Sequence, residues 1–574
     1  MKRLLSYFKN YKVRAILAPL FKMLEASFEL LVPLVMAAII DNGINNNDKP
    51  YIYRMGVVLI ALGIIGLVCS ITAQYFSAKV AMSIGRELRY DLFRHIETLS
   101  YTEIDEIGSS TLVTRMTSDI NQVQTGVNMF LRLFMRSPFI VFGATIMAFT
   151  VDAHAALVFL ITLPILIVIV FGIMFISIPL YKKVQEKLDK VTLKTRENLS
   201  GVRVIRAFNQ ENHEKNEFGE VTNELTKGQI FVGRINSFLN PLTYVVINLS
   251  IAALILKGGE RVDGGFIMQG SVYALVNYMS QILVELVKLA NLIITETKAV
   301  ACANRISDVF DTKSSQIYKN ENTLSKSGVP KIEFINAGLT YKHAKEASIE
   351  GVNLTVNKGD TIGIIGGTGS GKSSFVNLIP RFYDCTEGQI LIDGTDVKDY
   401  PKNELTDKIG IVPQRAVLFS GTIEDNIRWG KADATKEEIE LALDIAQAKS
   451  FVDEKEGGLS FKLNRGAKNL SGGQKQRLTI ARALVKRPEI LILDDSSSAL
   501  DYATDSALRM AIKEKTDATT FIVSQRATSI MYADKIVVLD DGKVVGLGTH
   551  DELLSSCEVY KEIYYSQNKE EVAS

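Results

Sequence analysis

The sequence has no excess of charge of either sign and very little cysteine. Its 65 Lys and Arg residues almost balance its 64 Asp and Glu residues, which gives a net charge of +1. This balance argues against a nucleic-acid-binding protein, because such proteins usually carry a strong basic excess. The four cysteines, Cys69, Cys302, Cys385 and Cys557, lie far apart and lack the spacing of metal ligands. They predict packing residues in a reducing compartment.

A cleavable signal peptide is not expected either. The first long apolar segment follows a basic start and is not followed by a small-residue cleavage site. What the chain does have is length and an uneven distribution of apolar residues. Its 574 residues are too many for one hydrophobic core and predict two or more domains. Long apolar runs crowd roughly the first half, and charged residues crowd the rest.

The apolar segments of the first half are each long enough to cross a bilayer, which takes about 20 residues. The six expected spans lie near residues 15–40, 54–78, 127–150, 155–179, 236–257 and 271–297. The connections 79–126 and 180–235 are long, charged and helical in pattern. Because Lys and Arg concentrate there and at the N-terminus, we expect all three regions in the cytoplasm. Residues 1–12 are basic and amphipathic, which suits a helix on the membrane surface or a solvated start to the first span.

Several ionisable residues fall inside the expected spans. Glu25 and Glu29 are four positions apart and share one helix face, and Glu285 precedes Lys288 by three positions. Charge is costly in lipid, so these side chains should face a cavity or pair with one another. Glu25, Glu29 and Glu285 therefore have two interpretations. They line a substrate path that favours cations, or they are structural residues that form ion pairs or lie near the membrane interface.

The second half begins after a polar stretch, residues 312–330, which predicts a linker. Strand-like segments at 331–334, 352–356 and 361–365 follow, and strands and helices then alternate to about residue 560. This alternation indicates an α/β nucleotide-binding domain. Residues 568–574 predict a loose tail.

The strongest motif is Gly366-Gly367-Thr368-Gly369-Ser370-Gly371-Lys372-Ser373. The strand expected before it and the helix expected over 374–379 provide the strand–loop–helix context of a phosphate-binding P-loop. Its glycines let backbone N–H groups close around phosphate oxygens. Lys372 reaches the β- and γ-phosphates, and the Ser373 hydroxyl is placed to bind Mg²⁺.

Two further motifs complete a recognisable set. Residues 490–494 (Ile-Leu-Ile-Leu-Asp) form an apolar strand ending in Asp494, the Walker B pattern that aims a carboxylate at Mg²⁺. Residues 470–474 (Leu-Ser-Gly-Gly-Gln) match the signature of ATP-binding-cassette (ABC) ATPases. With six spans ahead of it, essentially the whole chain resembles one half of an ABC exporter. The resemblance implies an α-helical transmembrane domain with an N-terminal amphipathic helix at 1–311, a linker at 312–330 and an α/β P-loop ATPase domain at 331–574.

The resemblance also implies a role for particular residues. Tyr341 matches the aromatic that stacks on adenine, and Gln414 matches the loop that touches Mg²⁺ and the transmembrane half. Ser471 and its glycines would bind the γ-phosphate of ATP held by the other cassette. Segment 197–211 matches the second cytoplasmic connection, whose short tip helix presses on the cassettes. The residues implied to bind ATP are Tyr341, Gly366, Thr368, Gly369, Ser370, Gly371, Lys372, Ser373, Ser374, Gln414, Ser471, Gly472, Gly473, Gln474 and Asp501, and those implied to hold Mg²⁺ are Ser373, Gln414 and Asp494.

Two catalytic positions depart from the family pattern. Asp495 stands where the family has a Glu that polarises the attacking water, and Gln525 stands where it has a His that contacts the γ-phosphate. The shorter Asp withdraws its carboxylate by about 1 Å, and such a misplacement can cost on the order of 10²-fold in rate. Gln525 donates a hydrogen bond but cannot move a proton. We expect this chain's own site to bind ATP and to hydrolyse it slowly or not at all.

The intact signature would then serve a competent site on another chain. The sequence therefore predicts the degenerate-site subunit of a heterodimeric exporter in a bacterial cell membrane, with its N-terminus and ATPase domain in the cytoplasm. ATP hydrolysis with a second half-transporter would drive the export of small amphipathic compounds. One alternative is a homodimeric exporter of lipid or peptide that tolerates Asp495 and Gln525. An alternative from another class is a membrane-bound ATPase that acts as a sensor or regulator.

Overall fold

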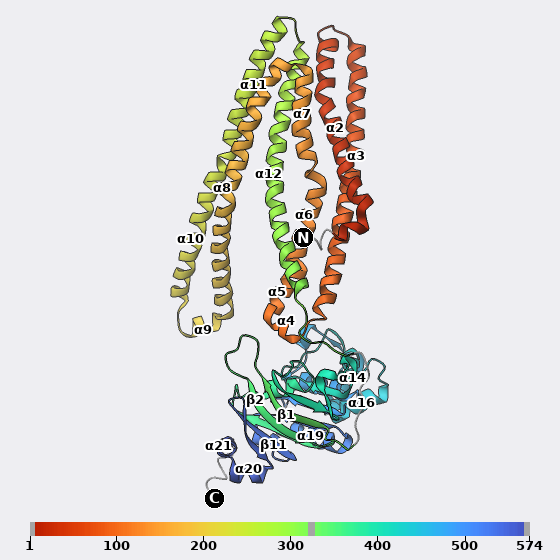
Figure 1. Cartoon of the computed structure of the whole chain (residues 1–574), viewed down its shortest axis with the longest axis vertical. Coiled ribbons are helices and arrows are strands. Elements are labelled where there is room, and N and C mark those ends of the chain that lie inside the picture. Colours follow the sequence, from red (N-terminus) through yellow and green to blue (C-terminus); the bar gives the residue numbers. More distant parts are fainter. Residues whose placement is uncertain (1–5, 320–327, 497, 568–574) are drawn as a thin grey trace. The chain divides into compact units, whose positions relative to one another are not determined.

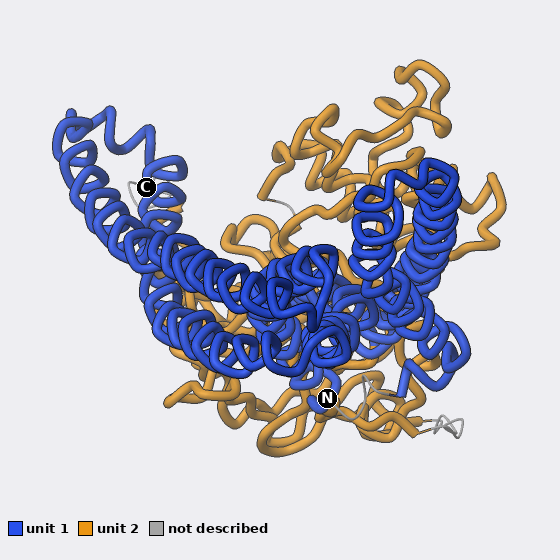
Figure 2. Tube along the Cα trace, turned by 90° about the horizontal axis from the view of Figure 1, so that it is seen from above, with its two compact units in different colours: residues 1–97, 110–312 blue, residues 98–109, 313–574 orange. Residues whose placement is uncertain are grey.

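The computed structural model describes residues 6–319, 328–496 and 498–567. Figure 1 labels many of its elements. The chain forms two compact units, coloured separately in Figure 2: residues 1–97 and 110–312 make unit 1, and residues 98–109 and 313–574 make unit 2. The middle of the expected linker, 320–327, and the expected tail, 568–574, lie outside the described residues.

Unit 1 is built from long helices. They are α2 (Lys12–Ala38), α3 (Lys49–Ile96), α5 (Ser109–Thr114), α6 (Ile120–Leu133), α7 (Arg136–Val151), α8 (Ala153–Ser200), α9 (Val202–Ala207), α10 (Glu211–Ser237), α11 (Leu239–Asp263) and α12 (Gln269–Asp311). Among the described residues, six helical stretches are long and apolar enough to cross a membrane. Each expected span falls inside one of them. At 1.5 Å per residue, the 48 residues of α3 or α8 exceed a bilayer core of about 30 Å, so these helices continue beyond it.

The third expected span, 127–150, is made of two helices. Helix α6 ends at Leu133, and α7 begins at Arg136. Pro138 lies in the first turn of α7, where a helix tolerates the missing N–H group of proline. The short helix expected within 197–211 is present as α9.

The helices of unit 1 pack closely at specific points. Gly270, at the start of α12, donates its backbone N–H to the Asp41 carboxylate at 2.7 Å. A Cβ atom on Gly270 would lie 2.3 Å from the carbonyl oxygen of Ala37, so only glycine permits this approach to the end of α2. The described part of the N-terminal segment packs on α3, where Tyr7 donates to Asp91 and Tyr11 to Glu87, both at 2.6 Å.

Unit 2 is the expected α/β domain, with two main sheets. The first has the order β2 (Ile349–Val356), β1 (Ile332–Leu339), β4 (Glu387–Ile392), β5 (Thr395–Asp396). The second has the order β12 (Lys543–Gly548), β11 (Lys535–Asp540), β3 (Thr361–Gly366), β10 (Thr519–Val523), β9 (Ile490–Asp494), β6 (Ile409–Val412), and is parallel except for β12. A small sheet pairs β7 (Gly421–Thr422) with β8 (Lys462–Leu463).

Helices flank these sheets and complete the unit. They are α4 (Tyr101–Ile107), α13 (Lys372–Leu378), α14 (Lys402–Lys408), α15 (Ile423–Arg428), α16 (Lys436–Ile445), α17 (Lys449–Asp453), α18 (Gly472–Leu484), α19 (Tyr502–Lys515), α20 (His550–Ser556) and α21 (Glu558–Gln567). Strands β3, β9 and β10 are buried almost throughout, as expected for the centre of a parallel sheet. Ligands of such sheets bind beyond the carboxyl ends of the strands, and the P-loop, Asp494 and Gln525 all follow these three strands.

Candidate functional site: a nucleotide site at the strand ends

The P-loop connects β3 to α13, and glycine is required at both of its ends. Gly371 has φ of 93°, and a Cβ atom there would lie 2.4 Å from the carbonyl oxygen of Ser348. A Cβ atom on Gly366 would lie 2.1 Å from the carbonyl oxygen of Leu539. Both approaches bring backbone from a neighbouring strand or loop against the P-loop. The motif glycines therefore fix the shape of a backbone cradle at the end of β3.

Lys372 is turned into this loop. Its Nζ atom donates to the carbonyl oxygens of Gly366 at 2.9 Å and Gly367 at 2.5 Å. Burial lowers the pKa of the Lys372 ammonium, while the nearby carboxylates of Asp495 and Asp494 act in the opposite direction. A cationic group in a glycine-built cradle, beside a helix start, is the donor set that suits the phosphates of ATP.

Asp494 lies at the end of β9 and is 7% exposed. Its Oδ1 accepts a hydrogen bond from the Ser373 hydroxyl at 3.2 Å. Burial raises the pKa of the Asp494 carboxyl, and the neighbouring Asp495 adds to the shift. Hydroxyl and carboxylate oxygens suit Mg²⁺, so Ser373 and Asp494 fit the metal that accompanies ATP. When bound, Mg²⁺ would neutralise charge on the β- and γ-phosphates.

Asp495 and Gln525, the two residues that depart from the family pattern, follow the ends of neighbouring strands. Strands β9 and β10 run parallel with Asp494 opposite Val523, and the backbone N–H of Asp495 donates to the Val523 carbonyl at 3.0 Å. Gln525 follows β10 by two residues and is exposed. Asp495 has the left-handed φ of 46°, and its Oδ2 accepts from the Gln414 amide at 3.2 Å. The structure thus places Asp494, Asp495 and Gln414 together, with Gln525 following the neighbouring strand.

The signature lies at the start of α18. Ser471 caps the helix: its hydroxyl accepts from the Gln474 backbone N–H at 3.3 Å, and its own N–H donates to the Gln474 side chain at 3.0 Å. Ser471 and Gly472 are exposed. Gln474 therefore acts as a cap in this chain. Asp501 does the same for α19, accepting from the Thr504 N–H at 2.9 Å.

Tyr341 lies beside a cavity of about 750 Å³ in unit 2. Its hydroxyl is 3.0 Å from that of Ser374, and its ring meets the Tyr383 ring edge-on with centroids 5.0 Å apart. The opposite wall comes from α4, where Asp105 accepts from the Tyr383 hydroxyl at 2.6 Å. Glu106 of α4 pairs with Lys342 at 2.5 Å. Sequence reasoning missed Tyr383 and α4, because no local pattern reveals which distant segment packs on this tyrosine.

The three glutamates proposed for a substrate path are all ion-paired. Glu25 pairs with Lys22 at 2.5 Å, and Glu29 pairs with Arg136 at 2.6 Å. Glu285 pairs with Arg136 at 2.6 Å and with Lys288 at 2.8 Å. All three glutamates therefore form ion pairs with cationic side chains of unit 1.

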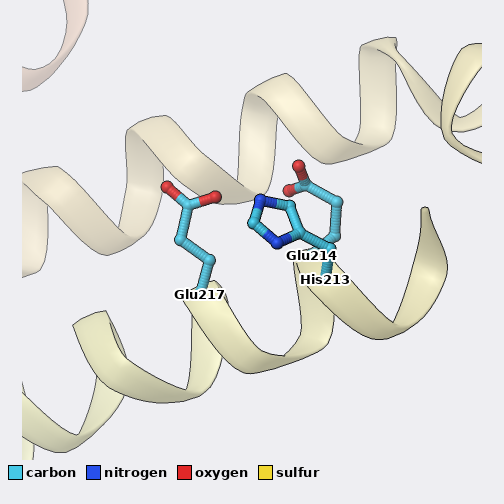
Figure 3. A group of neighbouring side chains, drawn as sticks. All are labelled: His213, Glu214 and Glu217. Atoms are coloured by element: carbon cyan, nitrogen blue, oxygen red, sulfur yellow. The ribbon is translucent and has the colours of Figure 1, made fainter.

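A second charged group lies on α10, as Figure 3 shows for His213, Glu214 and Glu217. Both carboxylates already face a cation, since Lys194 of α8 lies 2.9 Å from Glu214 and 2.6 Å from Glu217. The lysine supplies the positive charge between these side chains and ties α8 to α10 near the turn that holds α9.

Comparison with known proteins identifies the family. Residues 15–286 match the model of the ABC transporter transmembrane region, and residues 349–498 match that of the ABC transporter family. An uncharacterized ABC transporter ATP-binding protein of Mycobacterium bovis is 36% identical over 567 residues, covering 98% of this chain and 97% of the relative. The chain belongs to the ABC transporter family. It is an ABC exporter half-transporter, a multi-pass membrane protein whose six-span domain is fused to an ATPase domain.

Other relatives carry more specific names. A putative multidrug export ATP-binding/permease protein of Bacillus subtilis is 31% identical, covering 99% of each chain. An ATP-dependent lipid A-core flippase of Desulfotalea psychrophila is 30% identical, again covering 99% of each chain. The solved structure of a bacterial Atm1-family ABC exporter with ATP bound superimposes with a TM-score of 0.80 over 97% of this chain and 98% of that chain, at 22% identity. It confirms the fold.

Proposed function

We propose that this half-transporter is the degenerate-site subunit of a heterodimeric exporter of amphipathic compounds. Its P-loop would bind ATP with Mg²⁺ and turn it over slowly, and its signature would serve the competent site of the partner. The observation that carries the proposal is the pair of changes at adjoining strand ends. Asp495, in place of Glu, is hydrogen-bonded to Gln414, and Gln525, in place of His, cannot relay a proton.

The neighbouring groups support slow turnover rather than loss of binding. The P-loop, Lys372, Ser373 and Asp494 keep the residue types that hold phosphates and Mg²⁺. By contrast, the Asp495 carboxylate is one methylene shorter than Glu, and its Oδ2 atom is engaged by the Gln414 amide. We therefore expect this site to bind ATP and to hydrolyse it inefficiently.

The intact signature supports the second half of the proposal. Ser471 and Gly472 are exposed at the start of α18, and such helix starts bind anions. A partner cassette that brings its own ATP against this helix start would complete a second site. The partner should then carry Glu after its Walker B Asp and His in the switch position.

The decisive experiment is ATP turnover by this chain alone and together with its co-encoded half-transporter. Negligible turnover alone and substrate-stimulated turnover by the pair would support the proposal. Full turnover by the chain alone would overturn it and favour a homodimer. The named flippase among the relatives makes a lipid the substrate to test first in that case. If no amphipathic compound changes ATP turnover by the pair, the result would favour a membrane-bound ATPase that acts as a sensor or regulator.

A further inference from the structure

Six charged side chains from three packed helices of unit 1 form a charged cluster within the expected spans, in which Glu29, Arg136, Glu285 and Lys288 are linked in series and Lys22 pairs with Glu25 on the same face of α2 as Glu29. They are Lys22, Glu25 and Glu29 of α2, Arg136 of α7, and Glu285 and Lys288 of α12. The Nη2 atom of Arg136 meets Glu29 at 2.6 Å, and its Nη1 atom meets Glu285 at 2.6 Å. Glu285 also accepts from Ser137 at 2.8 Å. Three positive and three negative groups leave the cluster with no net charge.

The cluster is buried at its centre and open at two ends of opposite sign. The side chains of Arg136 and Glu285 are 8% and 3% exposed, whereas those of Glu29 and Lys288 are 42% and 44% exposed. In addition, the buried Nε atom of Arg136 has no hydrogen-bond partner among the residues that the structure describes. A cation can therefore approach the exposed Glu29, and an anion can approach the exposed Lys288, which shares Glu285 with Arg136.

We propose that this cluster binds the headgroup of a zwitterionic amphiphile, with Glu29 facing its cation and Lys288 and Arg136 facing its anion. This inference names a substrate class and rests on the proposed export function. We choose a zwitterionic substrate because the cluster carries no net charge. An isolated charge added to a balanced cluster in a low-dielectric region remains uncompensated, which is costly. A headgroup that carries both signs leaves every charge with a partner.

The test uses three radiolabelled probes that share a twelve-carbon chain: dodecylphosphocholine, dodecyl phosphate and dodecyltrimethylammonium. Each is titrated, at equilibrium, against the full chain in uncharged maltoside micelles. We expect the zwitterion to bind about tenfold more tightly than either charged probe. Glu29→Gln makes the cluster positive and should move the preference to dodecyl phosphate. Lys288→Met makes it negative and should move the preference to dodecyltrimethylammonium.

Matched variants test whether the same chemical changes act indirectly when they are made away from the cluster. Lys257 and Glu260 form an exposed pair on α11, so Lys257→Met and Glu260→Gln make the same chemical changes elsewhere and should leave the order of the probes unchanged. Lys288→Arg should retain the preference for the zwitterion. If folded Glu29→Gln and Lys288→Met proteins rank the three probes as the unmodified chain does, the cluster is only a structural ion-pair network. Binding needs neither hydrolysis nor a partner, so this failure is distinct from a failure of the export proposal.

Discussion

At the scale of single residues, Asp495 offers the most direct test of the proposed degenerate site, because Asp is one methylene group shorter than Glu. We predict that Asp495→Glu raises ATP turnover at this chain's own site by roughly 10- to 100-fold, because the longer carboxylate regains about 1 Å of reach toward the attacking water. Single-turnover hydrolysis of radiolabelled ATP by the two-chain complex, with the partner's site inactivated, measures the change. Asp495→Asn is the control and should not raise turnover. An unchanged rate for the Glu variant would assign the defect to Gln525 or to another part of the site.

Gly371 offers a test of the P-loop cradle. In Gly371→Ala the new methyl group would meet the Ser348 carbonyl oxygen at 2.4 Å while the residue holds φ at 93°. Left-handed strain and the clash together should cost about 1–3 kcal/mol of ATPase-domain stability and lower ATP affinity at least tenfold. Thermal unfolding and binding of a fluorescent ATP analogue measure both effects. Gly367→Ala is the matched control for stability, since a Cβ atom there meets nothing within 4 Å. Equal stability losses would contradict this account.

At the scale of elements, the short helix α4 belongs with the ATPase unit rather than with the long helices that flank it in sequence. Its start is fixed by Glu103, whose carboxylate accepts from the backbone N–H of Ser100 at 3.1 Å and of Ser315 at 3.2 Å. Its far side is held by the bond from Tyr383 to Asp105. Burial and this bond raise the pKa of Tyr383, so the phenol stays protonated and donates throughout the physiological range.

We predict that Tyr383→Phe loosens α4. The loss of one hydrogen bond should reduce the local stability by about 0.5–1.5 kcal/mol, which corresponds to roughly 2- to 10-fold faster amide exchange in residues 101–107. Hydrogen–deuterium exchange of the full chain measures this change, and ATP affinity should stay within about twofold. Tyr532→Phe, at an exposed tyrosine, is the control. Unchanged exchange in α4 would show that the aromatic packing of Tyr101 on Phe382, with centroids 4.7 Å apart, suffices to hold the helix.

The same elements show how far sequence reasoning reaches. The strand and helix around the P-loop and the strand β9 were predicted correctly, because glycine spacing and an apolar run act over a few neighbouring residues. The sequence analysis did not anticipate the break between α6 and α7, because prolines also lie inside the unbroken helices α2 and α8. The packing of α4 on Tyr383 and the contact of Glu29 with Arg136, 107 positions apart, depend on tertiary structure. The sequence left open whether the charges in the spans face a cavity or pair with one another, and it could not name the partners.

At the scale of the whole molecule, an exporter built from two unlike halves should respond unequally to damage at its two nucleotide sites. In the proposed complex, this chain contributes its P-loop to the slow site and its signature to the fast one. The asymmetry follows from the departures at Asp495 and Gln525, which affect only the site that holds this chain's P-loop. A homodimer has two equal sites and predicts equal responses.

We therefore predict opposite outcomes for two substitutions in this chain, measured as steady-state ATP turnover of the two-chain complex. Ser471→Arg places a bulky side chain at the exposed start of α18 and should reduce turnover by about 100-fold or more, because the partner's ATP loses its contacts with the signature. Lys372→Ala should reduce turnover by less than about threefold, since it removes a phosphate contact only at the slow site. Binding of a fluorescent ATP analogue confirms that Lys372→Ala has emptied that site. Similar losses from both substitutions would mean that the two sites work equally and would contradict a degenerate site in this chain.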